Sequence, residues 1–229
     1  MDFTQQVDAV SRAVCKDVLT LASGQPSRTI SLRQTFSTPR PPDRAALWDA
    51  LTKPERLATW FAPVSGDLRA NGRYSIAGNA SGTVTECHPP HGFALSWEVG
   101  DTISAVRVNL ESSSSSSSPS SDGDDGKTVV ELRHTFPVDA HWKKYGPGAG
   151  GVGWDMVLLG LAMHLRGMAK PSDEEWEASD EAAVFAQRAS DKWREAAVQG
   201  GEDEAWAKEA GDRTTAFYVP GWEAGSSKV

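Results

Sequence analysis

Two polar residues of this sequence could do chemistry inside a folded core, His134 and Asp155. On an alternating strand candidate, His134 shares one side with Val130, Leu132 and Phe136, so its imidazole is expected to point toward apolar neighbours. There it could act as a general base or orient a ligand hydroxyl, or it could be a hydrogen-bonded core histidine. Asp155 follows a glycine-rich segment at the start of a predicted helix. It could contact a ligand, or it could cap the helix, since the helix dipole favours a carboxylate at the N-terminus.

Aromatic residues form a second group of candidates. The chain has nine Trp among 229 residues, which is unusually many. Aromatic side chains bury large areas and offer π faces, so several of them could line a cavity for a flat or apolar ligand, although core packing alone would also explain them. The expected lining residues are Trp48, Trp60, Phe61, Trp97, Trp154 and Leu158, the last on the same predicted helix as Trp154.

No other group of residues has the spacing of a known site. Glu86, Glu98 and Glu131 lie on separate strand candidates, and nothing indicates that two of these carboxylates meet. His88 and His91 flank two prolines in a turn, and no set of side chains shows metal-ligand spacing. We therefore expect no metal and no cofactor, and we assign no catalytic residue.

The elements that must position these residues follow from the hydrophobic periodicity. The first 24 residues carry an apolar stripe at spacings of three and four, which predicts an amphipathic helix: Phe3, Val7, Val10, Val14, Val18 and Leu21. Asp43 is placed to cap a second helix, and Pro54 to begin a short third one that ends near Phe61. Strands are expected at 28–36, 72–77, 81–87, 93–99, 103–111 and 128–136. The short turns between most of them indicate an antiparallel meander.

The remaining segments are a polar tract, a glycine-rich stretch and two helical regions. Residues 112–126, rich in Ser, predict a disordered loop. Residues 146–153 are rich in glycine but lack the Lys-Ser/Thr pair of a phosphate-binding loop, so we interpret them as a flexible hinge or gate, with a plain connector as the alternative. The segment 152–168 is apolar almost all round and predicts a buried helix. The segment 172–218 predicts a helical tail with aromatic anchors.

Composition excludes several classes of protein. A net charge of -8 argues against a nucleic-acid partner, because phosphate-binding surfaces need clustered Lys and Arg. Cys15 and Cys87 stand far apart and suggest neither a disulfide framework nor a zinc site. The segment 152–168 is short for a membrane span and contains charged residues. The N-terminus has no apolar leader, so we expect a cytoplasmic protein without a membrane span.

Several stretches together resemble a known family. They are 47–57 (LWDALTKPERL), 60–68 (WFAPVSGDL), Gly72-Arg73-Tyr74 and Ser96-Trp97-Glu98. This pattern resembles the activator-of-heat-shock-protein-90-ATPase homology family of the START-like (SRPBCC) superfamily over residues 28–168. Glycines 146 and 148 around Pro147, the motif Gly153-Trp154-Asp155 and residues 212–218 are similar to single-domain microbial members with the same tail. The Ser-rich insertion departs from the pattern, and the separate chaperone-binding domain of the eukaryotic activator has no counterpart here.

The resemblance implies an α+β helix-grip fold, in which a curved antiparallel sheet wraps around a long C-terminal helix and leaves a cavity between them. We expect an N-terminal helix at 1–24, a helix-grip domain at 25–170 and a helical extension at 171–229. The leading hypothesis is that this cavity binds a small apolar or aromatic ligand, lipid-like or polyketide-like. One alternative is a co-chaperone-like regulator of the heat shock protein 90 ATPase, with a chaperone as partner. Another is a polyketide cyclase or dehydratase, although the sequence favours a protein that is not an enzyme.

Overall fold

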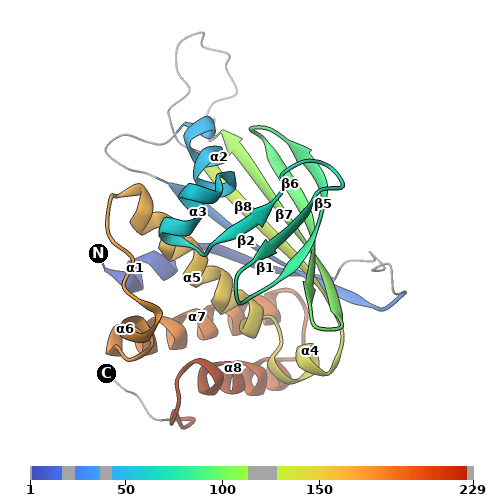
Figure 1. Cartoon of the computed structure of the whole chain (residues 1–229). Coiled ribbons are helices and arrows are strands. Elements are labelled where there is room, and N and C mark those ends of the chain that lie inside the picture. The colour runs from blue at the N-terminus through green and yellow to red at the C-terminus, as the bar shows by residue number, and fades with distance from the viewer. Residues whose placement is uncertain (1, 17–23, 37–42, 113–127, 226–229) are drawn as a thin grey trace, which may run out of the picture. The chain divides into compact units, whose positions relative to one another are not determined.

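The computed structural model describes residues 2–16, 24–36, 43–112 and 128–225 (Figure 1). In this part of the chain the strands are β1 (Ser11–Cys15), β2 (Ser27–Phe36), β3 (Val64–Gly66), β4 (Arg73–Ile76), β5 (Ser81–His88), β6 (Gly92–Val99), β7 (Thr102–Ser112) and β8 (Thr128–Pro137). The helices are α1 (Phe3–Asp8), α2 (Arg44–Thr52), α3 (Pro54–Trp60), α4 (Ala140–Tyr145), α5 (Gly148–Leu165), α6 (Asp173–Glu177), α7 (Asp180–Gln199) and α8 (Glu204–Tyr218).

The strands form one curved antiparallel sheet in the order β1-β2-β8-β7-β6-β5-β4-β3. This arrangement confirms the predicted α+β fold. The chain divides into two compact units. Unit 1 comprises Met1–Leu32, Thr135–Leu159 and Pro171–Val229, and unit 2 comprises Arg33–His134 and Gly160–Lys170. The predicted domain boundaries, 25–170 and 171–229, stay a prediction.

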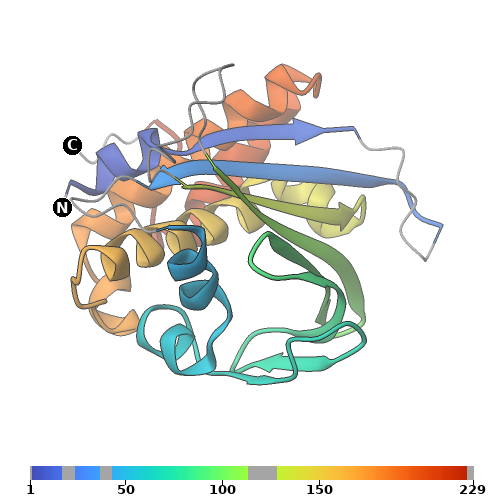
Figure 2. The same cartoon turned by 90° about the horizontal axis from the view of Figure 1, so that it is seen from above.

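Unit 2 is built on the meander from β3 to β8, whose strands bend as Figure 2 shows. The register of β6 and β7 places Leu95 opposite Val106, Trp97 opposite Ser104, and Ala94 opposite Arg107. Because successive side chains of a strand point to opposite faces, the first two pairs lie on an apolar face and the third on a charged one. The sheet of unit 2 therefore has one face suited to a core and one suited to water.

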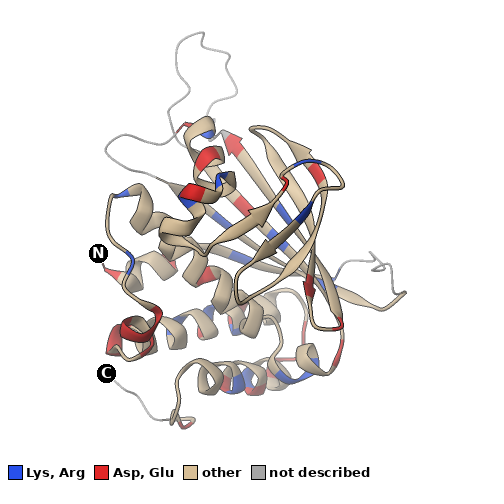
Figure 3. Ribbon diagram, in the orientation of Figure 1, with Lys and Arg blue, Asp and Glu red and all other residues tan. Residues whose placement is uncertain are grey.

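The strands of this sheet carry charged residues of both signs (Figure 3). Each of the three glutamates singled out in the sequence contacts an arginine there: Glu86 with Arg107, Glu98 with Arg73, and Glu131 with Arg33. The carboxylates are thus held apart on the outer face. These ion pairs between partly exposed side chains contribute little to stability.

The short helices of unit 2 begin where the sequence predicts. Asp43 caps α2, its carboxylate accepting from the Ala46 backbone N–H at 2.7 Å. Pro54 occupies the first turn of α3, where its missing N–H costs nothing. Leu47, Ala50, Leu57 and Trp60 form the buried side of the two helices.

Unit 1 contains the N-terminal segment, the start of α5 and the helical tail. Helix α7 contacts α1, β1 and α8, and α8 also contacts α4. Side chains of α8 satisfy carbonyl groups at the end of α4: Trp206 Nε1 donates to Lys143 O at 3.0 Å, and Thr214 Oγ1 donates to Tyr145 O at 3.0 Å. The predicted helical tail is confirmed, and its polar side chains hold α4 in place.

The predicted N-terminal helix over 1–24 is wrong. Helix α1 ends at Asp8, and residues 11–15 form strand β1. Val10 and Val14 are buried, and between them lies Arg12, whose side chain is only 3% exposed. A spacing of four residues fits a strand of period two as well as a helix, and the burial of Arg12 is what distinguishes them. Val18 and Leu21 lie outside the described residues, as do residues 113–126 of the predicted loop, whose first residue, Ser112, ends β7.

The interpretation of 146–153 as a hinge or gate is also wrong, because α5 begins at Gly148. Its glycines are sites of close approach. A Cβ at Gly151 would lie 2.2 Å from Cε2 of Trp193, and one at Gly148 would lie 2.8 Å from Oγ1 of Thr214. Glycine is therefore required here for contact between helices.

A further strand, β3, was not expected from the sequence.

Candidate ligand-binding site

The candidate site lies on the apolar face of the sheet in unit 2. Tyr74, Ile76 and Val84 form a buried cluster on β4 and β5. On the next strand Leu95 and Trp97 pack against this cluster but are themselves only partly buried. The apolar face is thus buried at Tyr74, Ile76 and Val84 and only partly covered at Leu95 and Trp97 of β6.

Two further aromatic residues lie beside this region. Phe61, which follows α3, packs against the same cluster and is also partly buried. Trp48 of α2 meets Phe93 of β6 edge to face, with ring centroids 6.0 Å apart. Phe93 points to the same face as Leu95 and Trp97, since the three alternate along β6. Of the predicted lining residues, the structure therefore brings Trp48, Phe61 and Trp97 to one face of the sheet.

A buried polar pair adjoins Trp97. Ser104 of β7 lies directly opposite Trp97, and its Oγ is 2.8 Å from Nε2 of His134 on β8. The Ser104 hydroxyl donates to the Trp97 carbonyl at 3.2 Å. The rings of Trp97 and His134 meet edge to face with centroids 5.8 Å apart. The three side chains form a compact group in which only Trp97 is more than marginally exposed.

Burial gives His134 unusual acid–base behaviour. His134 is only 3% exposed. Removal from water disfavours the charged imidazolium, so burial lowers the pKa of His134 to about 3. His134 is therefore neutral near pH 7. A general base works best with a pKa close to the working pH, so this imidazole is a weak base and a good neutral hydrogen-bonding group.

Trp60 belongs to the core of unit 2. It is 4% exposed, and its Nε1 donates to the Ala50 carbonyl of α2 at 3.1 Å. A Cβ at Gly160 of α5 would lie 3.0 Å from the Trp60 carbonyl oxygen, so α3 and the end of α5 are in close contact. A ligand contact of Trp60 stays a prediction, and we do not include this residue in the proposed site.

The helix α5 also carries a histidine in unit 2. Arg56 Nη2 lies 3.0 Å from Nε2 of His164, and Thr59 Oγ1 lies 3.4 Å from Nδ1. Because arginine can only donate, Nε2 of His164 must accept. Burial and the positive charge of Arg56 lower the pKa of His164. This residue joins α3 to α5.

The other predicted residues, Trp154, Asp155 and Leu158, lie in unit 1 and are buried. Asp155 is the eighth residue of α5, so the expected capping role is wrong. Its carboxylate instead receives hydrogen bonds from Arg12 and from Nε1 of Trp193. Burial raises the pKa of Asp155, while both hydrogen-bond partners act in the opposite direction. Ligand contacts of these residues stay predictions, and the occupied carboxylate gives no reason to include Asp155 in the proposed site.

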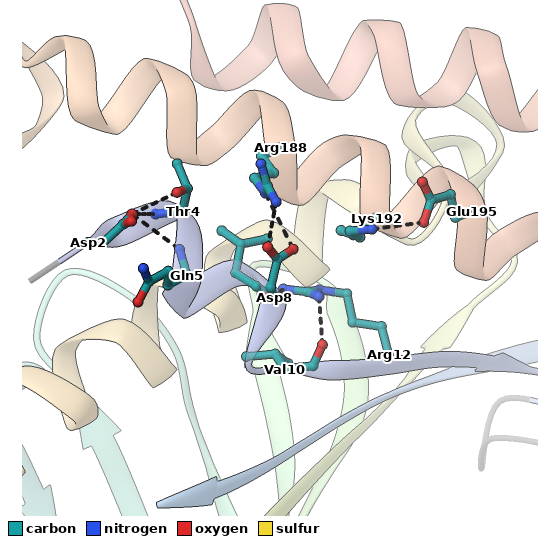
Figure 4. Close-up of polar contacts among 10 residues, drawn as sticks. Asp2, Thr4, Gln5, Asp8, Val10, Arg12, Arg188, Lys192 and Glu195 are labelled. Atoms are coloured by element: carbon teal, nitrogen blue, oxygen red, sulfur yellow. Dashed lines mark hydrogen bonds and ion pairs between the residues drawn. The ribbon is translucent and has the colours of Figure 1, made fainter. Parts of the chain in front are cut away.

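Figure 4 shows how the N-terminal segment meets α7 in unit 1. Arg12 also donates to the Val10 carbonyl at 2.8 Å, and Asp8 forms an ion pair with Arg188. Arg12 and Trp193 were missed from the sequence, because nothing local marks them as partners of Asp155. Ser104 was missed for a similar reason: a serine in an alternating strand carries no signal of its own.

Two classes of site find no support in the described part of the chain. No group of three His, Cys, Asp or Glu side chains there is arranged to hold a metal ion. Within the same residues, no helix has the length and apolar character needed to cross a membrane.

The fold and the half-covered apolar face define a START-like α+β protein. The sequence matches the family described as "Activator of Hsp90 ATPase homolog 1-like protein" over residues 42–166, which is more than half of the chain. This chain belongs to that family, as the sequence motifs predicted. No curated protein matches the sequence at a significant level.

Solved structures support this assignment. The solution structure of CalU16 from Micromonospora echinospora is 31% identical, with a TM-score of 0.63 over 84% of this chain and 97% of that one. The crystal structure of the same protein gives 30% identity and a TM-score of 0.61 over 82% and 98%. A Plasmodium falciparum protein described as an HSP90 activator is 18% identical over 62% of this chain and 99% of that one, with a TM-score of 0.47. The last likeness is too distant to carry a functional argument.

Proposed function

We propose that this protein binds a small apolar or aromatic ligand against the apolar face of the sheet in unit 2. The observation that carries the proposal is the group formed by Trp97, Ser104 and His134. A partly exposed indole lies next to a buried, neutral polar pair on an otherwise apolar face. Ligand sites commonly combine a mostly apolar lining with a few placed polar groups.

The uneven burial of the face supports the same proposal. Leu95 lies between Val84 on β5 and Val106 on β7, and both neighbours are at most 2% exposed. Leu95 itself is only partly buried. A side chain in the middle of an apolar face gains from full burial, so the gap in its cover is a natural place for a ligand.

The acid–base state of His134 favours binding over proton transfer. A neutral imidazole with a pKa of about 3 offers a hydrogen bond but little basicity near neutral pH. A cyclase or dehydratase centred on this residue would need a stronger base. The site is therefore better suited to hold a ligand than to deprotonate it.

The binding of naphthalene, measured by isothermal titration calorimetry and by chemical-shift changes in NMR, tests the proposal. Trp97→Ala should weaken the affinity by about fivefold to a hundredfold, since an aromatic contact contributes roughly 1 to 3 kcal/mol including its buried area. Trp206→Ala is the matched control, because Trp206 is a partly buried tryptophan of unit 1. It should leave the affinity unchanged. Absence of any naphthalene binding to the unmodified protein would overturn the proposal.

The family membership supports a second candidate, a regulator of the Hsp90 ATPase. A coupled ATPase assay with the chaperone of the same cell tests it directly. A rate that rises with added protein supports this role, and Trp97→Ala then shows whether the apolar face takes part. An unchanged rate over a wide range of concentrations rejects it.

A further inference from the structure

The two central strands of unit 2, β6 and β7, place no charged side chain on the apolar face of the sheet. On β6 this face carries Phe93, Leu95 and Trp97, and on β7 it carries Ser104, Val106 and Val108. Glu98 of β6 and Arg107 of β7 lie on the other face, where they pair with Arg73 of β4 and Glu86 of β5. The residues that β6 and β7 present to a ligand on this face therefore include no opposite charge that could offset the desolvation of an ion.

The polar pair next to Trp97 leaves a hydrogen-bond acceptor on Ser104. A serine hydroxyl has one hydrogen and two lone pairs. Ser104 Oγ lies 3.2 Å from the Trp97 carbonyl, to which it can only donate, and 2.8 Å from Nε2 of His134, where either atom can be the donor. In each arrangement Ser104 Oγ keeps at least one lone pair. The polar group that this pair presents to a ligand is an acceptor.

From this arrangement we infer that the site selects an uncharged aromatic ligand bearing a hydroxyl group, with Ser104 Oγ accepting the hydroxyl hydrogen while the ligand ring packs on Trp97. This inference rests on the function proposed above. His134 acts as a positioning residue, because its hydrogen bond fixes the Ser104 hydroxyl and does not reach the ligand.

The geometry favours a hydroxyl over the other common substituents of an aromatic ring. A carboxylate would bring a negative charge next to the Ser104 acceptor, where β6 and β7 present no Lys or Arg. A plain hydrocarbon would pack on Trp97 but leave the Ser104 lone pair without a donor. A hydroxyl satisfies the lone pair and adds no charge, so it is the substituent that the pair of Ser104 and His134 fits.

Three ligands of the same ring size test the inference by calorimetry at pH 7: naphthalene, 2-naphthol and 2-naphthoate. The unmodified protein should bind 2-naphthol about three to ten times more tightly than naphthalene, the gain of one neutral hydrogen bond. It should bind 2-naphthoate at least about tenfold more weakly than naphthalene, because burying an unpaired carboxylate is costly.

Ser104→Ala should abolish the preference for 2-naphthol over naphthalene, read as the ratio of the two affinities in the same variant, so that the two compounds bind within about twofold of each other. The matched control is Ser96→Ala, since Ser96 lies on the opposite face of β6 and bonds Glu98 and the Thr83 backbone. This control should keep the preference. His134→Phe should weaken the preference without abolishing naphthalene binding.

The outcomes separate the two proposals. If none of the three compounds binds, the proposed function fails and the inference falls with it. If naphthalene binds but 2-naphthol binds no better, if 2-naphthoate binds as tightly, or if Ser104→Ala keeps the preference, the inference alone is overturned.

Discussion

The guanidinium group of Arg12 donates two hydrogen bonds to the carboxylate of Asp155, 143 residues further along the chain: Nη2 to Oδ1 at 2.7 Å and Nε to Oδ2 at 3.1 Å. The two side chains are 3% and 1% exposed. Trp193 Nε1 donates to the same Oδ2 at 2.9 Å. One buried carboxylate thus joins strand β1, helix α5 and helix α7 within unit 1.

Asp155→Ala is expected to destabilise the protein by about 3 to 5 kcal/mol, because it leaves the Arg12 charge buried without a counter-ion. Urea unfolding followed by circular dichroism measures the loss. The control is Arg188→Gln, which breaks the ion pair between Arg188 and Asp8. These side chains are 45% and 46% exposed, respectively. This control should cost at most about 1 kcal/mol. Equal losses in the two variants would contradict the structural role of the buried pair.

Gly151→Ala should also be strongly destabilising, by about 2 to 4 kcal/mol, since a Cβ there would lie 2.2 Å from the Trp193 ring and force the indole away from Asp155. Gly153→Ala is the matched control in the same helix. Its Cβ would meet only Tyr218 Oη, at 3.4 Å. That change should be neutral or stabilising by up to about 1 kcal/mol, because alanine favours the helix. Thermal unfolding of both variants compares them, and a larger loss in Gly153→Ala would refute the packing argument.

The meander and the family could be predicted because their signals are local. Alternation along β6 and β8 is enough to place Trp97 and His134 on apolar faces, and the structure agrees. Local signals fail where a distant partner decides the outcome. Arg12 looks like a polar residue of a helix until Asp155 is seen to neutralise it, and the glycines of α5 look like a hinge until the Trp193 ring is seen against them.

The candidate site shows the same limit. Its aromatic residues stand out in the sequence by type, but their roles differ by contact: Trp60 bonds Ala50 and lies in the core, whereas Trp97 stays partly exposed. Ser104 could not be chosen from among the other serines of the chain. Only the register of β6, β7 and β8 brings it to His134 and Trp97.

Trp60→Phe tests the division between core and site. The phenyl ring keeps most of the packing but leaves the buried Ala50 carbonyl without its donor, which should cost about 1 to 3 kcal/mol. Trp206→Phe removes the same kind of bond, from Nε1 to Lys143 O, in an exposed setting, where water can replace the donor. It should cost less than about 1 kcal/mol. Chemical denaturation measures both, and neither variant should change the affinity for naphthalene.

The depressed pKa of His134 makes stability depend on pH. The group is neutral in the folded protein down to about pH 3, whereas in the unfolded chain it takes up a proton below about pH 6.5. Its contribution is therefore fully present above pH 6.5 and is lost as the pH falls from 6.5 toward 3. Each pH unit below 6.5 should lower the free energy of unfolding by about 1.4 kcal/mol. His164, whose pKa is also lowered, adds a loss of the same sign.

Urea unfolding at pH 7.5, 6.5, 5.5 and 4.5 isolates the part that belongs to His134. The comparison with His134→Gln is needed because the other histidines and some carboxyl groups also titrate in this range, and their contributions are common to both proteins. His134→Gln should lower stability at pH 7.5 but reduce the fall between pH 6.5 and 4.5 by about 2 to 3 kcal/mol. A substitution that merely disturbs packing lowers the free energy of unfolding equally at every pH, so it does not change the dependence of that free energy on pH. The same slope in both proteins would show that His134 is accessible to protons in the folded state, and that the polar pair with Ser104 is less buried than the structure indicates.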